Sequence, residues 1–169
     1  MYYSCKSEIF AKDNDGFHSK SIEDVLNFVF ATKTDSILYK KSDYENYTIE
    51  NKTTRLKMNS DDCIDEKYKM NGVYFLLSEN KKKLLYIGKS KDVKKRLAEH
   101  LLDCAKNTNS KMGEISEYLK HKNTKKINYC AIKVDSEENA SILETLLIWY
   151  CLNRKNNDER FDQMFNVRR

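Results

Sequence analysis

The chain contains 169 residues, of which 40% are hydrophobic and 34% are charged, and its formal net charge is +5. This composition is typical of a folded globular protein and excludes a largely disordered chain. It has no apolar run near the roughly 18 residues of a membrane-spanning helix, and its first ten residues do not resemble a signal peptide.

The five cysteines are widely spaced and include no Cys-x-x-Cys pair. Such a pattern indicates neither a zinc site nor a disulfide framework. We therefore expect reduced thiols in a cytoplasmic protein that makes no contact with a membrane.

The positive charge is concentrated in the second part of the chain. Residues 1–67 contain 10 Lys and Arg against 13 Asp and Glu, whereas residues 68–169 contain 21 against 13. A basic surface suits a polyanionic partner, because lysine and arginine displace the counterions that surround phosphates. A solvated lysine-rich surface explains the same charge equally well.

The N-terminal part predicts few regular elements. Ser21, followed three residues later by Asp24, has the form of a capping box, and the apolar residues after it predict a helix over residues 22–32. Another short element is expected over residues 35–39. The stretch 52–67 contains few apolar residues and is interpreted as a linker or loop.

The linker ends in an acidic cluster made of Asp61, Asp62, Asp65 and Glu66. Carboxylates suit hard cations, but this spacing matches no calcium-loop pattern, so a solvated loop is the preferred interpretation. We place a domain boundary after residue 66. It separates an N-terminal extension, residues 1–66, from a second unit, residues 67–169.

A β-hairpin is predicted immediately after this boundary. Two apolar runs, Val73–Leu77 and Leu84–Ile87, are joined by the six polar residues Ser78–Lys83. Short apolar runs joined by a polar link are typical of two antiparallel strands. Gly88 ends the second run, and both Gly72 and Gly88 are expected to allow close backbone approach at the strand ends.

A helix of about three turns is predicted next, because Val93, Leu97 and Leu101 recur at helical spacing. Ser90 is expected to cap this helix, with Asp92 in its first turn. Arg96 and His100 are four residues apart and therefore lie on one face of the helix.

The remaining chain predicts a helix over residues 112–122, a strand over 126–134 and a long helix from Ser136 to about Arg154. Glu144 lies in the most apolar part of that last helix. A carboxylate buried there without a partner would be costly, so we expect it to meet a metal ion, a cation or the solvent.

Two triplets, Gly72-Val73-Tyr74 and Tyr86-Ile87-Gly88, followed by a helix with Arg96 and His100, resemble the GIY-YIG nuclease family. Valine at the middle of the first triplet is a mild variant of the usual isoleucine. Glu144 fits the glutamate that the family carries on a later helix. The resemblance covers roughly residues 68–158.

The resemblance implies an α+β fold, with a three-stranded, mostly antiparallel sheet flanked by helices and preceded here by an N-terminal extension. It implies a metal-dependent DNA endonuclease of restriction-like, structure-specific or mobile-element type. The implied catalytic residues are Tyr74, Tyr86, Arg96, His100 and Glu144.

Each implied residue has a chemical role. Glu144 would hold Mg²⁺ or Mn²⁺, and the fixed fork of Arg96 would stabilise the transition-state phosphate. Tyr74 would act as the general base or position the attacking water, although a free phenol with a pKa near 10 is a poor base. Tyr86 would orient the nucleophile or the phosphate, and His100 would bond a phosphate or a tyrosine hydroxyl.

Contacts with nucleic acid are predicted around the same place, from Lys89, Ser90, Lys91, Lys94 and Lys95. These residues would bind backbone phosphates and carry no sequence information. Asn156, twelve residues after Glu144, is the candidate for an asparagine that the family carries after the catalytic helix; Asn153 and Asn157 are alternatives.

Other interpretations stay open at this point. RNA is an alternative substrate to DNA. A catalytically silent nucleic-acid-binding module would keep the basic residues without a working site. The N-terminal extension is open to a role in substrate specificity, in binding a protein partner or in forming a homodimer, with the nuclease fold then serving as a scaffold.

Overall fold

The computed structural model describes residues 21–38, 64–106, 114–115, 117–118, 121–122 and 126–166. The predicted helix over residues 112–122 lies largely outside these ranges. Asp61 and Asp62 of the acidic cluster lie outside them entirely.

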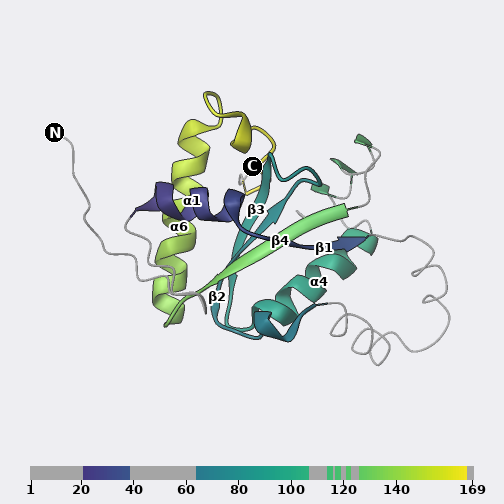
Figure 1. The fold of residues 1–169 in the computed structure, drawn as a ribbon, viewed down its shortest axis with the longest axis vertical. Coiled ribbons are helices and arrows are strands. Elements are labelled where there is room, and N and C mark those ends of the chain that lie inside the picture. Colours follow the sequence, from purple (N-terminus) through teal and green to yellow (C-terminus); the bar gives the residue numbers. More distant parts are fainter. Residues whose placement is uncertain are drawn as a thin grey trace.

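Within the described ranges, four strands form one antiparallel sheet in the order β1-β4-β2-β3 (Figure 1). The strands are β1 Asp35–Leu38, β2 Gly72–Leu77, β3 Leu84–Ser90 and β4 Lys126–Lys133. β2, β3 and β4 make up the three-stranded antiparallel sheet that was predicted. β1, from the N-terminal part of the chain, adds a fourth strand beside β4.

Helices cover both faces of the sheet, which confirms the predicted α+β class (Figure 1). The described helices are α1 Ile22–Ala31, α4 Val93–Lys106 and α6 Glu137–Arg154, with short 3₁₀ helices η1 Glu66–Tyr68 and η2 Glu159–Phe161. α1 and α6 pack on one face and α4 packs on the other. None of the described helices is long and apolar enough to cross a membrane.

The helix caps agree with the sequence in two of three cases. The hydroxyl of Ser21 accepts the Asp24 N–H at the start of α1, and Ser136 caps α6 in the same way. The prediction for α4 is wrong by two residues. Asp92 is the cap, because its Oδ1 accepts the Lys95 N–H, while Ser90 bonds only to the backbone of Asp92.

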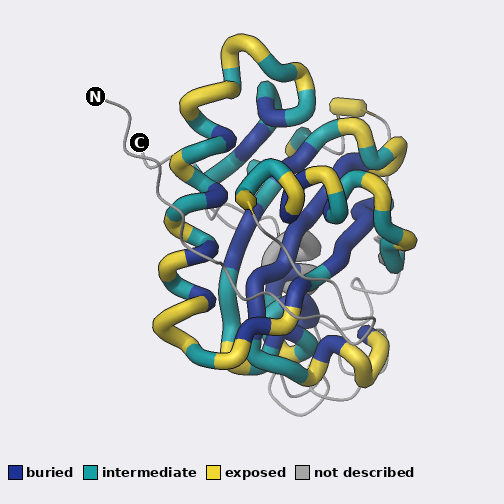
Figure 2. The backbone as a smooth tube through the Cα atoms, turned by 60° about the vertical axis from the view of Figure 1, so that its left-hand side comes forward, coloured by how far each residue is buried: buried dark blue, intermediate teal, exposed yellow. Residues whose placement is uncertain are grey.

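The face of the sheet under α1 and α6 is an apolar core. Alternate residues of β2 point into it, and their neighbours in the sequence point to the opposite face. Its buried residues include Val25, Leu26, Val29, Val73, Phe75, Leu77, Leu84, Ile87, Ile132, Leu143, Leu147 and Phe161. Each such side chain contributes roughly 1.5–3 kcal/mol by burial, so this face supplies much of the stability. Figure 2 shows the buried strands and the exposed outer side of α6.

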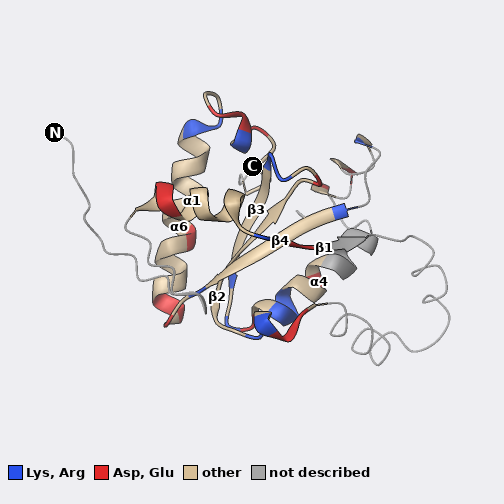
Figure 3. Cartoon of the chain, in the orientation of Figure 1, with Lys and Arg blue, Asp and Glu red and all other residues tan. Residues whose placement is uncertain are grey.

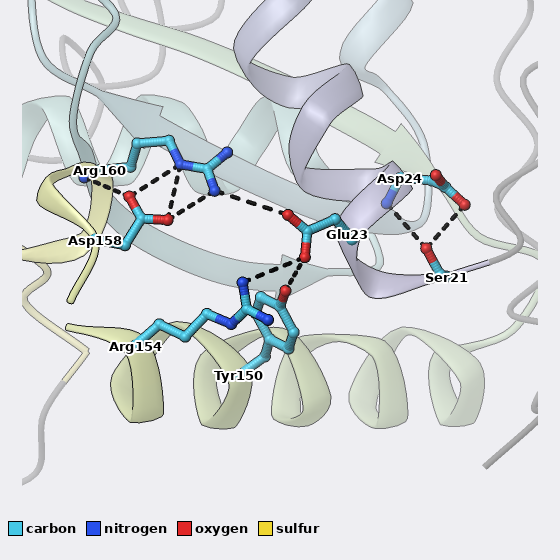
Figure 4. Close-up of polar contacts among 7 residues, drawn as sticks. All are labelled: Ser21, Glu23, Asp24, Tyr150, Arg154, Asp158 and Arg160. Carbon is cyan, nitrogen blue, oxygen red and sulfur yellow. Dashed lines mark hydrogen bonds and ion pairs between the residues drawn. The ribbon is translucent and has the colours of Figure 1, made fainter. Parts of the chain in front are cut away.

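Polar contacts tie α1 to α6 and η2 (Figure 4). The Glu23 carboxylate accepts the hydroxyl hydrogen of Tyr150 and lies 3.4 Å from Arg154 and 3.9 Å from Arg160. Arg160 in turn binds both carboxylate oxygens of Asp158. α1 and β1 therefore share one core and one sheet with the later elements, and the proposed division after residue 66 stays a prediction.

Cys130 in β4 and Cys151 in α6 are free and buried. Burial raises the pKa of each thiol to about 12. Because the thiolate is the reactive form, these two side chains behave as small apolar groups of the core.

Candidate active site

The two glycine-containing triplets are joined by the pairing of β2 and β3. Tyr74 lies directly opposite Gly88, and the Tyr74 ring passes over the space where a side chain at Gly88 would stand. A Cβ at Gly88 would be 2.9 Å from Tyr74 Cε1 and still closer to the hydroxyl. Gly88 therefore allows the phenol to lie flat on the neighbouring strand. Gly72 is similarly confined, by the backbone of Ile132 in β4.

The hydroxyl of Tyr74 is the centre of a compact polar cluster on the α4 face. It lies 2.5 Å from Nε2 of His100, which α4 brings over the sheet. The rings of Tyr86 and His100 are in edge contact, with centroids 5.5 Å apart, and the Tyr74 and Tyr86 centroids are 6.2 Å apart. Three side chains named as candidates from the sequence therefore touch one another.

This cluster is enclosed by the protein. Tyr74 is 1% exposed and His100 is 4% exposed. Burial, assisted by the Arg96 charge, lowers the pKa of His100 to about 3. Burial also raises the pKa of Tyr74 well above its usual value, although Arg96 opposes that rise. Both groups are consequently neutral over the physiological range of pH.

Arg96 stands one turn before His100, half-exposed at the rim of the cluster. Its Nη1 lies 2.8 Å from the carboxylate of Glu99. Burial lowers the pKa of the guanidinium, but hydrogen bonding and charge from Glu99 and Tyr74 outweigh burial and leave it raised. Arg96 is therefore a fixed cation beside the Tyr74 hydroxyl.

Glu144 reaches the cluster from the opposite side of the sheet. α6 packs on the apolar face, and the half-buried Glu144 side chain approaches the outer edge of β3, where Lys89 lies. Burial raises the pKa of the Tyr86 and Tyr74 phenols, and the nearby Glu144 carboxylate adds to that rise. Burial raises the pKa of Glu144 itself, against the charge and the backbone N–H of Lys89.

Comparison with known families agrees with this arrangement. The GIY-YIG catalytic domain matches residues 70–157, which is more than half of the chain. The chain belongs to the GIY-YIG family. Neither the curated proteins nor the solved structures contain a match to it.

GIY-YIG nucleases generally depend on a divalent metal. Among the described residues of this GIY-YIG domain, no three His, Cys, Asp or Glu side chains are grouped so as to hold a metal ion. Glu144 nevertheless fits a cation that takes one protein carboxylate and fills its other positions with water and phosphate, as Mg²⁺ does. The pKa of Glu144 is raised by burial, and no lysine or arginine in the described part forms an ion pair with it, so a cation would relieve its desolvation.

The predicted phosphate-binding lysines of the GIY-YIG domain are near the site but are mostly paired with acids. Lys and Arg positions are concentrated along the chain at the start of α4 and in the preceding turn (Figure 3). Lys91 and Lys89 lie 2.8 and 3.9 Å from Glu137 in the first turn of α6. Lys94 is paired with Glu66, whereas the Lys95 side chain is exposed.

Two residues of the acidic cluster, Asp65 and Glu66, lie within the described part of the chain. Asp65 caps the short helix η1 by accepting the Lys67 N–H, and Glu66 is occupied by Lys94. Both therefore have structural partners, and Glu66 lies in the short helix η1 rather than in the loop that was predicted.

Asn156 was the candidate for the asparagine that follows the catalytic helix in this family. Asn156 is exposed in the turn that follows α6, which ends at Arg154. A different residue, Asn166, binds the backbone of β3 through its side chain. No local pattern singles out Asn166, because its partner is 79 residues away. Glu99, by contrast, could be found from its i,i+3 spacing to Arg96.

Proposed function

We propose that this protein is a metal-dependent DNA endonuclease that hydrolyses phosphodiester bonds. The observation that carries the proposal is the convergence of Tyr74, Tyr86, Arg96 and His100 from one face of the sheet with Glu144 from the other. A purely structural cluster would not need a half-buried carboxylate and a half-exposed arginine at its rim. Restriction-like, structure-specific and mobile-element enzymes are the expected types.

His100 is assigned as the acceptor of the Tyr74 hydroxyl hydrogen. Arg96 can only donate, so the Tyr74 hydrogen turns to the neutral Nε2 of His100. This leaves the lone pairs of the Tyr74 oxygen to accept hydrogen bonds from Arg96 and from a water molecule. Tyr74 would thereby orient the attacking water towards the phosphorus.

The pKa values of Tyr74 and His100 argue against proton transfer between these two side chains in the free protein. The pKa of His100 is about 3, and that of Tyr74 lies above 10. The two pKa values are shifted in opposite directions, so transfer of the Tyr74 proton to His100 is strongly unfavourable in the free protein. In the free protein Tyr74 thus positions water, and it becomes a base only if substrate and cation binding lower its pKa.

Arg96 and Glu144 supply the charge chemistry. Arg96 presents paired N–H donors, which match the oxygens of a phosphate and stabilise charge as it develops in the transition state. To do so it exchanges its exposed ion pair with Glu99 for the substrate. Glu144 would hold Mg²⁺ or Mn²⁺, which when bound supplies charge stabilisation to the phosphoryl and leaving oxygens.

Tyr86 completes the cluster on the substrate side. It is less buried than Tyr74, its ring contacts the His100 imidazole, and the Glu144 carboxylate lies near enough to act on its hydroxyl. We assign it the orientation of the nucleophile or of the scissile phosphate. Lys89, Ser90, Lys91, Lys94, Lys95 and Asn156 remain the proposed contacts to backbone phosphates, with RNA as the alternative substrate.

Nicking of supercoiled plasmid by the purified protein tests this proposal. Magnesium, manganese and EDTA are compared for the wild type, for Glu144→Ala, and for Glu138→Ala, which changes an exposed carboxylate on the same helix. We expect metal-dependent nicking by the wild type and by Glu138→Ala. Glu144→Ala should bind DNA and lose cleavage, because its cation site is gone.

Two results would contradict the proposal. Wild-type rates in Glu144→Ala would remove Glu144 from the mechanism. DNA binding without cleavage by the wild type, with several DNA forms and both metals, would favour a catalytically silent nucleic-acid-binding module.

A further inference from the structure

The outer side of α6 carries apolar side chains that the described part of the chain leaves open to solvent (Figure 2). Trp149 is 65% exposed and Ile142 is 56% exposed. The inner side of the same helix packs Leu143, Leu147 and Cys151 into the core. A helix that is apolar on all sides is normally buried on all sides, so the outer side of α6 is a candidate contact surface.

The open residues of α6 have the spacing of a helix that packs against another helix. Ile142 and Trp149 are seven residues apart, and Thr145 and the half-buried Leu152 repeat the same spacing one turn later. Residues seven apart lie almost directly above one another on a helix, and two such rows three residues apart form one seam. The outer side of α6 therefore presents a continuous stripe rather than two isolated side chains.

This stripe is complementary to itself when a second helix runs in the opposite direction. A two-fold axis between Thr145 and Leu146 brings Ile142 of each copy opposite Trp149 of the other, because both lie equally far from that point. The Thr145 hydroxyl donates to the Ser141 carbonyl at 2.8 Å, so this small side chain at the crossing needs no polar partner outside its own helix. A symmetric contact requires such reciprocal pairs.

The charges at the two ends of α6 favour the same direction. Its first turn carries Glu137 and Glu138, and its last turn carries Arg154. In an antiparallel pair the acidic end of one helix lies beside the basic end of the other, and the helix dipoles also oppose one another. A parallel pair would place Glu138 beside its own copy, with repulsion between like charges.

We propose that the outer side of α6 binds a second copy of this chain, in an antiparallel two-fold contact that pairs Trp149 with Ile142. Glu144 lies about 140° round the helix from Trp149, at about 100° per residue, so the contact leaves the candidate active site open. The inference goes beyond the proposed function and does not depend on cleavage of DNA.

The contact is expected to be weak. One helix from each copy makes a small interface, and interfaces below about 1,200 Å² are typical of weak complexes. We expect a monomer–dimer equilibrium with a Kd of roughly 10–100 µM. At the low micromolar concentrations of optical unfolding experiments the chain is then mostly a monomer.

Trp149 makes the contact directly measurable, because it is the single tryptophan of the chain. Sedimentation velocity and tryptophan emission of the full chain are recorded from well below to well above the expected Kd. We expect the mass to rise to that of a dimer. Over the same concentrations the emission should move to shorter wavelength and acrylamide quenching should fall, because the indole leaves water.

Ile142→Glu tests the apolar pair and keeps the tryptophan. It should weaken the dimer on the order of tenfold or more, because a carboxylate would be buried against Trp149 without a partner. Its emission should stay at long wavelength at every concentration. His121→Glu is the matched control, since it introduces the same side chain at an exposed position outside α6. Both variants should keep the wild-type thermal midpoint at low concentration.

Glu138→Lys tests the direction of the two helices. In the antiparallel pair it should weaken the dimer about threefold at low salt, because it places a lysine near Arg154 of the other copy. The difference should shrink at high salt, where exposed charges are screened. An affinity equal to that of the wild type, or higher, would overturn the antiparallel contact.

Three further results would overturn the proposal. The first is a wild type that stays monomeric at all concentrations with the long-wavelength emission of an exposed indole. The second is a monomer whose emission is at short wavelength at every concentration, which would show that the same chain covers Trp149. The third is a dimer that Ile142→Glu leaves intact, which would place the contact elsewhere on the molecule.

Discussion

The two faces of the sheet use the same strands for different purposes. Towards α6, β2 presents Val73 and Phe75, which pack into an apolar core without polar partners. Towards α4 it presents Tyr74, whose hydroxyl meets a buried histidine. The alternation of a strand therefore separates stability from chemistry, one residue apart. Glu144 is the exception, because it belongs to a helix of the stabilising face but its carboxylate reaches the edge of the other.

The largest expected effect is on the α4 face. Arg96→Ala should reduce cleavage roughly a thousandfold, because a preorganised donor to the developing charge is lost. Arg96→Lys should recover only part of the lost cleavage rate, because lysine keeps the positive charge but lacks the planar, paired N–H donors of the guanidinium. Single-turnover cleavage and the thermal midpoint are measured together, with Lys122→Ala as a control for loss of a surface charge. A full recovery by lysine would mean that charge alone matters.

The opposite face should respond in the opposite way. Leu143→Ala should lower the free energy of unfolding by about 3 kcal/mol, through lost burial and the cavity left behind. Cleavage per folded molecule should not change. Urea unfolding measures the change in free energy. Ile142→Ala is the control, because it changes an exposed residue of the same helix and should have little effect on stability. If Leu143→Ala lowered turnover of the folded fraction, the separation of the two faces would fail.

The buried His100 should make stability depend on pH. In the unfolded chain its pKa is about 6.5, whereas in the folded protein it is about 3. Between pH 7 and 5 the unfolded chain binds a proton that the folded chain does not, so stability falls as pH falls. This group accounts for about 2 kcal/mol over that interval.

Urea unfolding of the wild type and of His100→Asn from pH 5 to 7 checks this dependence. The variant should show a shallower slope, because the histidine contribution is gone. His121→Asn, which changes an exposed histidine, should keep the wild-type slope. Parallel slopes for the wild type and His100→Asn would show that His100 takes up a proton as readily in the folded state as in the unfolded chain.

The smallest effect is expected when the ion pairs of Lys89 and Lys91 with Glu137 of α6 are removed. Glu137→Gln should tighten DNA binding about threefold, because Lys91 and Lys89 no longer share their charge with a carboxylate. Glu138→Gln, which removes a neighbouring charge without breaking an ion pair, should change affinity less. Fluorescence anisotropy at several salt concentrations measures both. Equal gains in the two variants would indicate general charge rather than specific release of the lysines.

Local patterns predicted much of the fold. The hairpin was expected over 73–77 and 84–87 and extends over 72–77 and 84–90, and the first helix differs from its predicted end by one residue. Capping Ser21 and Ser136 were found because a hydroxyl bonding an amide three residues on is a local interaction. The cap of α4 was misplaced because Ser90 and Asp92 both offer an oxygen there, and only the backbone path selects Asp92.

The site was predictable residue by residue but not as an arrangement. Spacing placed Arg96 and His100 on one helix face, and paired strands placed Tyr74 beside Tyr86. The ion pairs of Lys91 with Glu137 and Arg160 with Glu23 join segments 46 or more residues apart, so no local pattern indicates them. β1 also depends on its pairing with β4, across some 90 residues of chain.

The sequence by itself determined the alternation of β2 and β3, the helical faces of α4 and α6 and the glycines that the triplets need, because these follow from the period of each element. Only the tertiary structure decided that His100 is held neutral against Tyr74, that Glu144 comes round the edge of β3, and that Asn166 closes that edge. Burial and long-range backbone pairing produce these features, and both depend on how distant segments pack rather than on the order of neighbouring residues.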